Sequence, residues 1–250
     1  MRGRPLAAHR LILEVAGLCA LALSGCANAP GRPLEGDMPI VPSQISDFSV
    51  LYNQNCAGCH GPDGKGGAAI ALSDPVYLAI ADDTVIRRTA TNGIPGTSMP
   101  AFAQTAGGML TDKQVEVIVR GIRERWSKPD ALRGANPPPY SSSEPGDASR
   151  GSQVYAAYCS SCHGSGGRGG SKASSIVDGP FLALLTDQEL RTIVIAGRPE
   201  LGAPDWRGDF PGKPMSPGDV SDVVAWLIAQ RPQFPGQPYS SALKPEGGVQ

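Results

Sequence analysis

The sequence predicts an all-α protein that contains two tandem copies of one small unit. Alternation of apolar and polar residues at period two is nowhere sustained, whereas several apolar segments with helical spacing follow residues typical of helix N-caps. A cysteine motif at residues 56–60 also recurs at residues 159–163. The 32 glycines and 24 prolines among 250 residues indicate loop-rich units, whose apolar side chains are too thinly spread for one large core.

The repeated motif is Cys-x-x-Cys-His, and its surroundings repeat with it. Tyr52 and Tyr155 each lie four positions before the first cysteine of their copy. Glycine-rich segments follow the two histidines, at residues 61–67 and 164–170. Matched features at matched positions indicate that each half of the chain repeats one structural unit.

Each unit is predicted to close with a helix that has a clear start. In the first unit Thr111 is the expected N-cap and Gln114 completes a capping box, ahead of apolar residues at helical spacing. In the second unit Ser216 is the expected N-cap and Pro217 occupies the first helical position. The two closing helices are therefore counterparts.

A shorter helix and a loop precede each closing helix. A Thr-x-x-Glu capping box at residues 186–189 predicts a helix that Gly197 ends, and residues 82–93 are its counterpart in the first unit. Beyond these helices, residues 93–102 align without a gap with residues 197–206.

The expected organisation follows from the repeat and from changes in composition. Runs of three prolines and three serines mark a linker between the two units, and a second linker precedes the first unit. The predicted segments are a signal peptide at 1–25, a linker at 26–42, a first domain at 43–128, a linker at 129–147, a second domain at 148–235 and a tail at 236–250.

The first residues are predicted to direct export and then to be removed. A basic start precedes an apolar stretch, Leu11 to Leu23, that Glu14 interrupts and that is too short for a spanning helix. The following Ser-Gly-Cys26 completes a segment that resembles the lipobox of bacterial lipoproteins. This resemblance implies cleavage before Cys26 and a lipid on its thiol, which would anchor an exported protein at the periplasmic face of a membrane. The alternative is an ordinary secretory signal with a chance cysteine.

The Cys-x-x-Cys-His pattern is typical of covalent haem attachment. On one helical turn the two thiols reach the two vinyl groups at one porphyrin edge, and the adjacent imidazole is directed at the iron. A thioredoxin-like pair, a zinc site and a structural disulfide are the alternatives. No βαβ pattern accompanies the motif, the four cysteines that zinc would need belong to separate repeats, and a disulfide would not require a histidine at the same place twice. The predicted cofactor is haem c, attached at two sites, and the predicted attachment residues are Cys56, Cys59, His60, Cys159, Cys162 and His163.

On these residues each unit resembles a class I cytochrome c domain, and the chain is identified as a dihaem c-type cytochrome. The resemblance covers about residues 43–128 and 148–235. It implies a first helix that runs into the attachment motif, a loop that bears a methionine ligand, and a closing helix that crosses the first one.

Methionine is the natural sixth ligand, because the two motif histidines are the only ones that remain after removal of the signal peptide. In the first unit Met99 lies in Thr-Ser-Met-Pro-Ala-Phe, which matches the ligand loop of the family. Met109, the other local methionine, is expected to be a core residue ahead of the helix cap. Ligation by histidine and methionine raises the haem potential, which suits an electron carrier.

The second unit departs from this pattern, because Ala203 stands at the position of Met99. Met215 is the remaining candidate for the iron ligand, although it aligns with Leu110. A five-coordinate or water-ligated iron, or another ligand such as Lys213, are the alternatives. Loss of the thioether at this position should lower the haem potential or leave a coordination position open.

These features together predict electron transfer. The expected partners are redox proteins or a membrane respiratory complex, in a periplasmic or cell-surface respiratory or photosynthetic chain. A net charge of −1 gives no indication of nucleic-acid binding, which favours a basic surface. The alternative is a haem enzyme, a peroxidase or sulfur-oxyanion oxidoreductase, that uses an open second haem. The polar residues beside Ala203 are Asp205, Trp206 and Arg207, for which ordinary loop packing is the simpler interpretation.

Overall fold

The structure of the chain is a computed structural model that describes residues 31, 33, 35–208 and 213–232. The chain divides into residues 1–44 and residues 45–250. The described part of the first segment contains two short 3-10 helices, Glu35–Asp37 and Pro42–Gln44. The predicted signal peptide, the lipid-attachment candidate Cys26 and the predicted tail lie outside the described residues.

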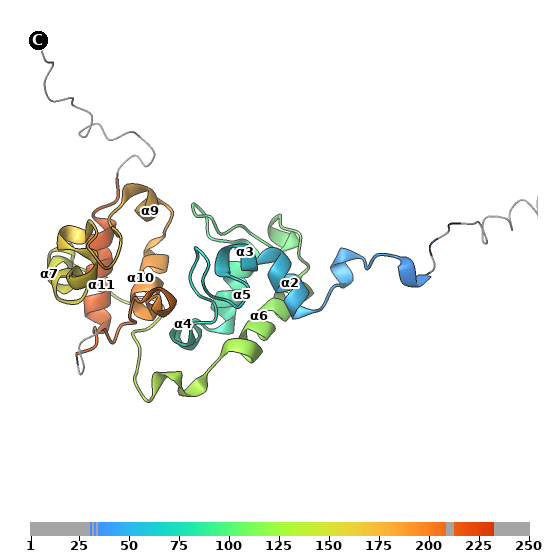
Figure 1. The fold of residues 1–250 in the computed structure, drawn as a ribbon, viewed down its shortest axis with the longest axis horizontal. Helices are drawn as coiled ribbons and strands as arrows, with labels where there is room; N and C mark the ends of the chain where they lie inside the picture. Colours follow the sequence, from blue (N-terminus) through green and yellow to red (C-terminus); the bar gives the residue numbers. More distant parts are fainter. Residues whose placement is uncertain (1–30, 32, 34, 209–212, 233–250) are drawn as a thin grey trace, which may run out of the picture. The chain divides into compact units, whose positions relative to one another are not determined.

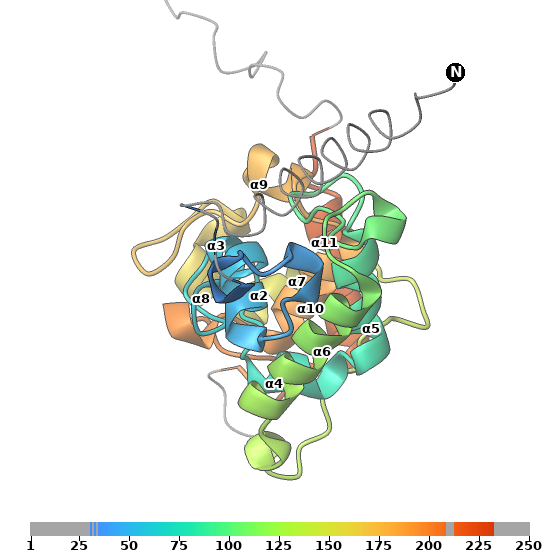
Figure 2. The same ribbon diagram turned by 90° about the vertical axis from the view of Figure 1, so that its right-hand side faces the viewer.

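The described part of residues 45–250 is helical, which confirms the predicted all-α class. Helix α2 (Phe48–Asn55) leads into the short helix α3 (Ala57–His60), and α4 (Pro75–Ile80), α5 (Asp83–Asn92) and α6 (Asp112–Trp126) follow (Figure 1). Both α2 and α5 pack against α6, and Figure 2 shows α5 beside α6. Among the described residues there are isolated bridges but no strand.

The second half repeats this order of helices. Helix α7 (Ala148–Tyr158) leads into α8 (Ser160–His163), and α9 (Gly179–Ala183), α10 (Asp187–Ala196) and α11 (Pro217–Ile228) follow. The long helix α7 packs against α11, as α2 packs against α6 (Figure 1). Of all helices in the described part of the chain, none combines the length and apolar character that crossing a bilayer demands.

The predicted helix starts are confirmed. Thr111 and Gln114 form a capping box at α6, and Thr186 with Glu189 forms one at α10, which ends at Gly197. Ser216 caps α11, and its capping box is completed by an aspartate, Asp219. Each box satisfies backbone N–H groups that a helix start leaves without partners, so these short sequences define where the helices begin.

In both halves a glycine packs against a larger side chain where the first and last helices cross, at α2 and α6 and at α7 and α11. A Cβ atom on Gly121 of α6 would lie 2.0 Å from a ring atom of Phe48 on α2. A Cβ atom on Gly151 of α7 would lie 2.0 Å from the carbonyl oxygen of Asp222 and 2.8 Å from Cβ of Trp226 on α11. The repeat aligns Phe48 with Gly151 and Gly121 with Trp226. The glycine and the aromatic residue have therefore exchanged helices.

The proline- and serine-rich linker lies along the second half and is bound to it. Arg191 of α10 is only 4% exposed, and its guanidinium donates to the carbonyl oxygens of Pro139 and Tyr140 and to the hydroxyl of Ser221. Pro138 of the proline run is fully buried. The linker is thus part of the packed structure along this stretch.

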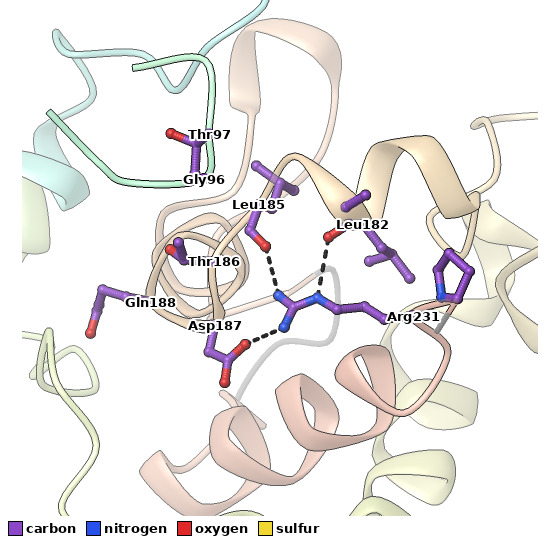
Figure 3. Close-up of a pocket in the computed structure, with 10 residues that line it drawn as sticks. Gly96, Thr97, Leu182, Leu185, Thr186, Asp187, Gln188 and Arg231 are labelled. Atoms are coloured by element: carbon purple, nitrogen blue, oxygen red, sulfur yellow. Dashed lines mark hydrogen bonds and ion pairs between the residues drawn. The ribbon is translucent and has the colours of Figure 1, made fainter. Parts of the chain in front are cut away.

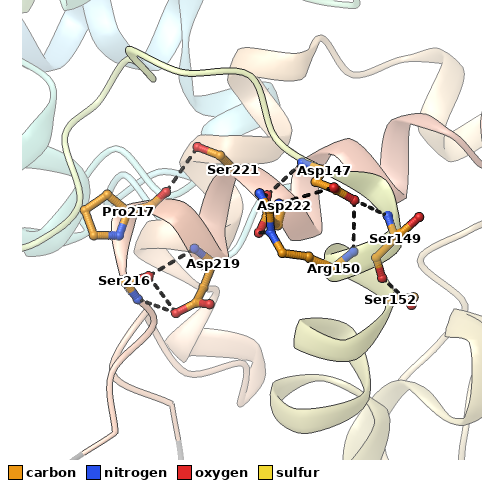
Figure 4. A network of polar contacts seen from close by, with 9 residues as sticks. All are labelled: Asp147, Ser149, Arg150, Ser152, Ser216, Pro217, Asp219, Ser221 and Asp222. Atoms are coloured by element: carbon orange, nitrogen blue, oxygen red, sulfur yellow. Dashed lines mark hydrogen bonds and ion pairs between the residues drawn. The ribbon is translucent and has the colours of Figure 1, made fainter.

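A polar network fixes the end of the linker to α11 (Figure 4). The N–H of Asp147 donates to the buried carboxylate of Asp222 at 2.7 Å, and Arg150 binds the same carboxylate through Nε at 2.8 Å and Nη2 at 3.0 Å. This charge-assisted pairing holds the pKa of Asp222 below its usual range. The linker end and the start of α7 are therefore held at the same point of α11.

Met109 is not a core residue, contrary to the prediction. Its side chain is 82% exposed, whereas the neighbouring Leu110 is buried. The N–H of Leu110 donates to the carbonyl oxygen of Phe102 at 2.7 Å, in a short stretch of extended backbone. Adjacent side chains of extended backbone point to opposite sides, so burial of Leu110 turns Met109 outward.

The tight crossing of α7 and α11 gives a test of the fold. We expect Gly151→Ala to destabilise the intact protein by about 1–3 kcal/mol, because the added methyl group meets backbone that must shift. Gly218→Ala in α11 is the matched control, because its nearest neighbour is a hydroxyl at 3.7 Å, and it should be neutral or stabilising by up to about 1 kcal/mol. Chemical denaturation measures both, and equal stability of the two variants would contradict the tight crossing.

Candidate functional site

The first motif lies on a single helical turn at the end of α2. Cys56 ends α2 and begins α3, which carries Cys59 and His60. The N–H groups of Cys59 and His60 both donate to the carbonyl oxygen of Cys56, at 3.2 and 3.0 Å. This turn places two free thiols and an imidazole side by side along the chain.

The second motif has the same local geometry at the end of α7. Cys159 ends α7 and begins α8, which carries Cys162 and His163. The corresponding N–H groups donate to the carbonyl oxygen of Cys159 at 3.2 and 3.0 Å, and both cysteines are free thiols. The predicted site residues are therefore brought together as two separate sets of three.

Each motif histidine is oriented by a backbone carbonyl. His60 Nδ1 lies 2.8 Å from the oxygen of Ile70, and His163 Nδ1 lies 2.8 Å from the oxygen of Ser174. A carbonyl oxygen only accepts, so Nδ1 must carry the proton and Nε2 presents its lone pair. This is the arrangement by which proteins orient an imidazole that binds a metal. The donor set of both motifs therefore fits a covalently held haem.

The two imidazoles differ in burial. His60 is 7% exposed, and burial lowers its pKa, with the charge of Arg198 lowering it further and the hydrogen bond to Ile70 opposing both. His163 is only partly buried. The first site is thus more protected from water than the second.

The leading thiol of each motif is not a reactive thiolate. Burial raises the pKa of Cys56 to about 12 and that of Cys159 to about 11, and in each case the second thiol of the motif adds to the shift. Redox-active Cys-x-x-Cys pairs require a lowered thiol pKa. These values argue against the thioredoxin-like alternative.

A tyrosine and a glycine shape the loop that follows each motif. The hydroxyl of Tyr52 donates to the carbonyl oxygen of Gly61 at 2.8 Å, and Tyr155 donates likewise to Gly164 at 2.5 Å. Gly61 has φ of 82°, and a Cβ there would lie 1.8 Å from the oxygen of Lys65. Only glycine allows this sharp return of the chain over the motif, which explains the repeated Tyr and Gly.

A tryptophan packs on each of these tyrosines, and the repeat alignment does not relate the two tryptophans. Trp126 meets Tyr52 edge-on, with ring centroids 5.1 Å apart, and Trp226 stacks on Tyr155 at 4.3 Å. Trp126 comes from the last position of α6, whereas Trp226 lies inside α11. The repeat gives no signal for Trp226, because the matching position of the first half is Gly121.

An arginine within or just beyond each closing helix binds the turn before α5 or α10. Arg123 of α6 donates to the carbonyl oxygens of Leu78 and Ala81 and pairs with Asp83 at 2.5 Å. Arg231, just beyond α11, does the same in the second half, as Figure 3 shows. Its partners are the carbonyl oxygens of Leu182 and Leu185, at 3.2 and 2.7 Å, and the carboxylate of Asp187, at 2.5 Å. These residues also line a cavity of about 520 Å³, together with Gly96 and Thr97.

Ala203 occupies the structural position of Met99, as the alignment predicts. The carbonyl oxygen of Met99 accepts from the N–H of Ile94 at 2.9 Å, and that of Ala203 accepts from the N–H of Arg198 at 3.0 Å. The glycine that ends the preceding helix, Gly197 in the second half, makes the same close approach in both loops. The two loops thus share a backbone but differ in the side chain where a methionine ligand is expected.

Met215 lies at the position of Leu110 and is nearly buried, with 8% of its surface exposed. Its N–H donates to the carbonyl oxygen of Trp206 at 2.8 Å, just as Leu110 donates to Phe102. Lys213, the other ligand that the sequence suggests, is exposed.

The polar residues beside Ala203 pack as an ordinary loop. Trp206 is 2% exposed, Arg207 lies 4.8 Å above its ring, and Asp205 pairs with Arg207 at 2.5 Å. Because the two charges satisfy each other, the arrangement supports the packing interpretation over an acid or base for catalysis.

Comparison with known proteins connects these sites to a family. The family described as cytochrome c oxidase, cbb3-type, subunit III matches residues 43–120 and 146–227. The chain is 27% identical to the cbb3-type cytochrome c oxidase subunit FixP of Azorhizobium caulinodans, over 68% of this chain and 56% of FixP. It is 30% identical to the corresponding subunit CcoP of Azospirillum sp., over 58% of this chain and 47% of CcoP.

A second group of relatives is similar over more of the chain. The cytochrome bc1 complex cytochrome c subunit of Mycobacterium bovis is 23% identical, over 74% of this chain and 64% of that subunit. The chain spans about half the length of FixP and CcoP.

Proposed function

We propose that this chain relays single electrons through two covalently attached haems c. The premise is that the chain belongs to the family described as cytochrome c oxidase, cbb3-type, subunit III, a family of c-type cytochromes that transfer electrons. The observation that carries this proposal is the pair of Cys-x-x-Cys-His turns, each with its histidine hydrogen-bonded to a backbone carbonyl. A bound haem c supplies an iron that gains and loses one electron.

The residues of the first half hold and tune one such group. Cys56 and Cys59 would bind the porphyrin edge as thioethers, and His60 would present Nε2 to the iron because the carbonyl of Ile70 holds its other nitrogen. Met99, in the loop after α5, would supply a thioether as a further ligand of the iron. Burial of His60 and a thioether ligand both favour a high potential.

The second half would hold a haem of lower potential through Cys159, Cys162 and His163. His163 is less buried than His60, and Ala203 offers no donor atom where Met99 would bind. The greater exposure of His163 favours a lower potential, whereas the missing donor at Ala203 calls for a ligand from another position. Electrons would then pass from the second haem to the first.

We propose Met215 as the iron ligand of the second haem. Its side chain is nearly buried. Its backbone N–H donates to the carbonyl oxygen of Trp206, which lies three residues after Ala203. A thioether at this point is longer and softer than the leucine that stands at the matching position of the first half.

Partners and location follow from the relatives. FixP and CcoP are subunits of cbb3-type oxidases, and the mycobacterial relative is a subunit of a cytochrome bc1 complex. We propose that this chain exchanges electrons with a respiratory complex or its redox partners at the periplasmic face of a membrane, where a lipid on Cys26 holds it.

A haem enzyme is the second candidate function, and Ala203 is the observation that favours it. An iron without a methionine ligand would bind a small exogenous molecule such as carbon monoxide or cyanide. Spectra of the ferric and ferrous protein that stay low-spin and do not shift with these ligands would exclude this candidate.

The number of haems tests the main proposal. We expect a mass increase of two haems per chain and two one-electron steps in a redox titration, because each half supplies a complete attachment turn. The double variant Cys56→Ser/Cys59→Ser should lose one haem, and Cys159→Ser/Cys162→Ser should lose the other. A single haem in the unaltered protein would contradict the proposal.

The distal ligands are tested by matched methionine variants. Met99→Leu should change the spectrum and lower the potential of the first haem only, and Met215→Leu should do so for the second only, because each removes one thioether. Met109→Leu is the control, since Met109 is 82% exposed. An unchanged second haem in Met215→Leu would show that Met215 is not its ligand.

The lipid anchor is tested at the predicted cleavage site. Cys26→Ser should abolish acylation, so that mass spectrometry finds no lipid on the protein. Cys19→Ser lies inside the predicted signal peptide and should leave the lipid in place. An unaltered protein that carries no lipid at Cys26 would refute the anchor.

A further inference from the structure

Arg198 reaches from the second half to the backbone of the first. Its Nη2 donates to the carbonyl oxygen of Gly67 at 2.9 Å, and its Nη1 lies 3.4 Å from that of Ala68. Its Nε donates to Glu200 at 2.5 Å, and both charged side chains are only 15% exposed. Arg198 is therefore a nearly buried charge that binds two parts of the chain at once.

The segment that Arg198 binds is the one that encloses the first attachment turn. A Cβ on Gly67 would lie 2.0 Å from the carbonyl oxygen of Cys59, so this backbone runs directly over the motif. The N–H of Ala69 donates to the same carbonyl oxygen at 3.0 Å, and Ile70 accepts the hydrogen bond from His60. A contact at residues 67–68 thus acts close to the histidine that would bind the first iron.

The backbone of Arg198 belongs to the loop on the ligand side of the second site. Its N–H donates to the carbonyl oxygen of Ala203, and its own carbonyl oxygen accepts from Ala203, both at 3.0 Å. The backbone of Arg198 is therefore fixed to Ala203, which stands at the position of Met99, and its side chain is fixed to the loop over the first motif.

The contact is specific to the second half. The repeat aligns Arg198 with Ile94 and Glu200 with Gly96, neither of which carries a charge. An ion pair that stabilised the fold of each half would be expected in both halves. Arg198 and Glu200 occur in the second half only, and Arg198 binds the first half, as expected of a contact between the two halves. Helices α4 and α10 also meet, so the two halves touch beyond this residue.

We propose that Arg198, held by Glu200, is a positioning residue for electron transfer between the two haems. It holds the attachment loop of the first haem against the ligand-side loop of the second and places a positive charge beside the first haem. The proposal rests on the two-haem function. The bound haems would exchange one electron, with the second oxidised and the first reduced and no bond made or broken.

The charge of the pair gives a test that a purely structural contact would fail. In Arg198→Met the first haem's midpoint potential should fall, because a positive charge that favours the reduced iron is removed. In Glu200→Gln it should rise, because the charge of Arg198 is no longer neutralised. A merely structural role predicts the same direction for both variants, since both break the ion pair.

The rate between the haems gives a second readout. After rapid reduction of one haem in the full-length protein, we expect electron transfer to the other to be slower in Arg198→Met, because the hydrogen bond that holds the two loops together is lost. Glu200→Gln keeps the donor to Gly67 and should slow it less. Arg207→Met is the control. Arg207 lies in the same loop but pairs with Asp205 of that loop, so its removal should leave the rate unchanged.

Two results separate this proposal from the proposed function. A protein with two haems whose first potential moves in the same direction in both variants, or not at all, would overturn the role of Arg198 alone. A protein with one haem per chain would overturn the two-haem function itself. Opposite shifts together with the slower rate would support both.

Discussion

The hydrogen bond from the ring Nδ1 of each motif histidine to a backbone carbonyl constrains most of each half. It requires the chain to return over the attachment turn within about ten residues, and Gly61 and Tyr52 make that return possible in the first half. The turn itself must continue a helix, and that helix must be supported by the closing helix. The fold can thus be understood as the scaffold that aims one imidazole nitrogen.

The two halves meet these requirements with different residues. A glycine and an aromatic residue exchange helices at the crossing, as Phe48 with Gly121 and Trp226 with Gly151 show. The arginine that binds the turn before the middle helix lies within the closing helix in the first half and beyond it in the second. Packing requires a side chain of a given size and polarity at a point in space, and several helix positions can deliver it.

The halves also differ where they would tune a bound haem. His60 is buried and its half carries Met99 in the loop after α5, whereas His163 is more exposed and the matching loop of its half carries Ala203. The loop with Ala203 also carries Arg198, which binds the first half and is held by Glu200. On the same backbone hydrogen bonds, the second loop therefore supplies a contact between the halves.

The sequence by itself determined the helical class, the capping boxes and the two Cys-x-x-Cys-His turns, because each of these depends on residues close together in the chain, and the recurrence of these local patterns revealed the repeat. It also located Ala203 at the place of Met99, since that loop aligns without a gap. Only the tertiary structure decided that Met109 points outward, that Trp226 packs on Tyr155, and that Arg198 binds Gly67. These outcomes depend on which surfaces meet when the chain folds. A local sequence pattern contains no information about the distant segment against which a residue will pack.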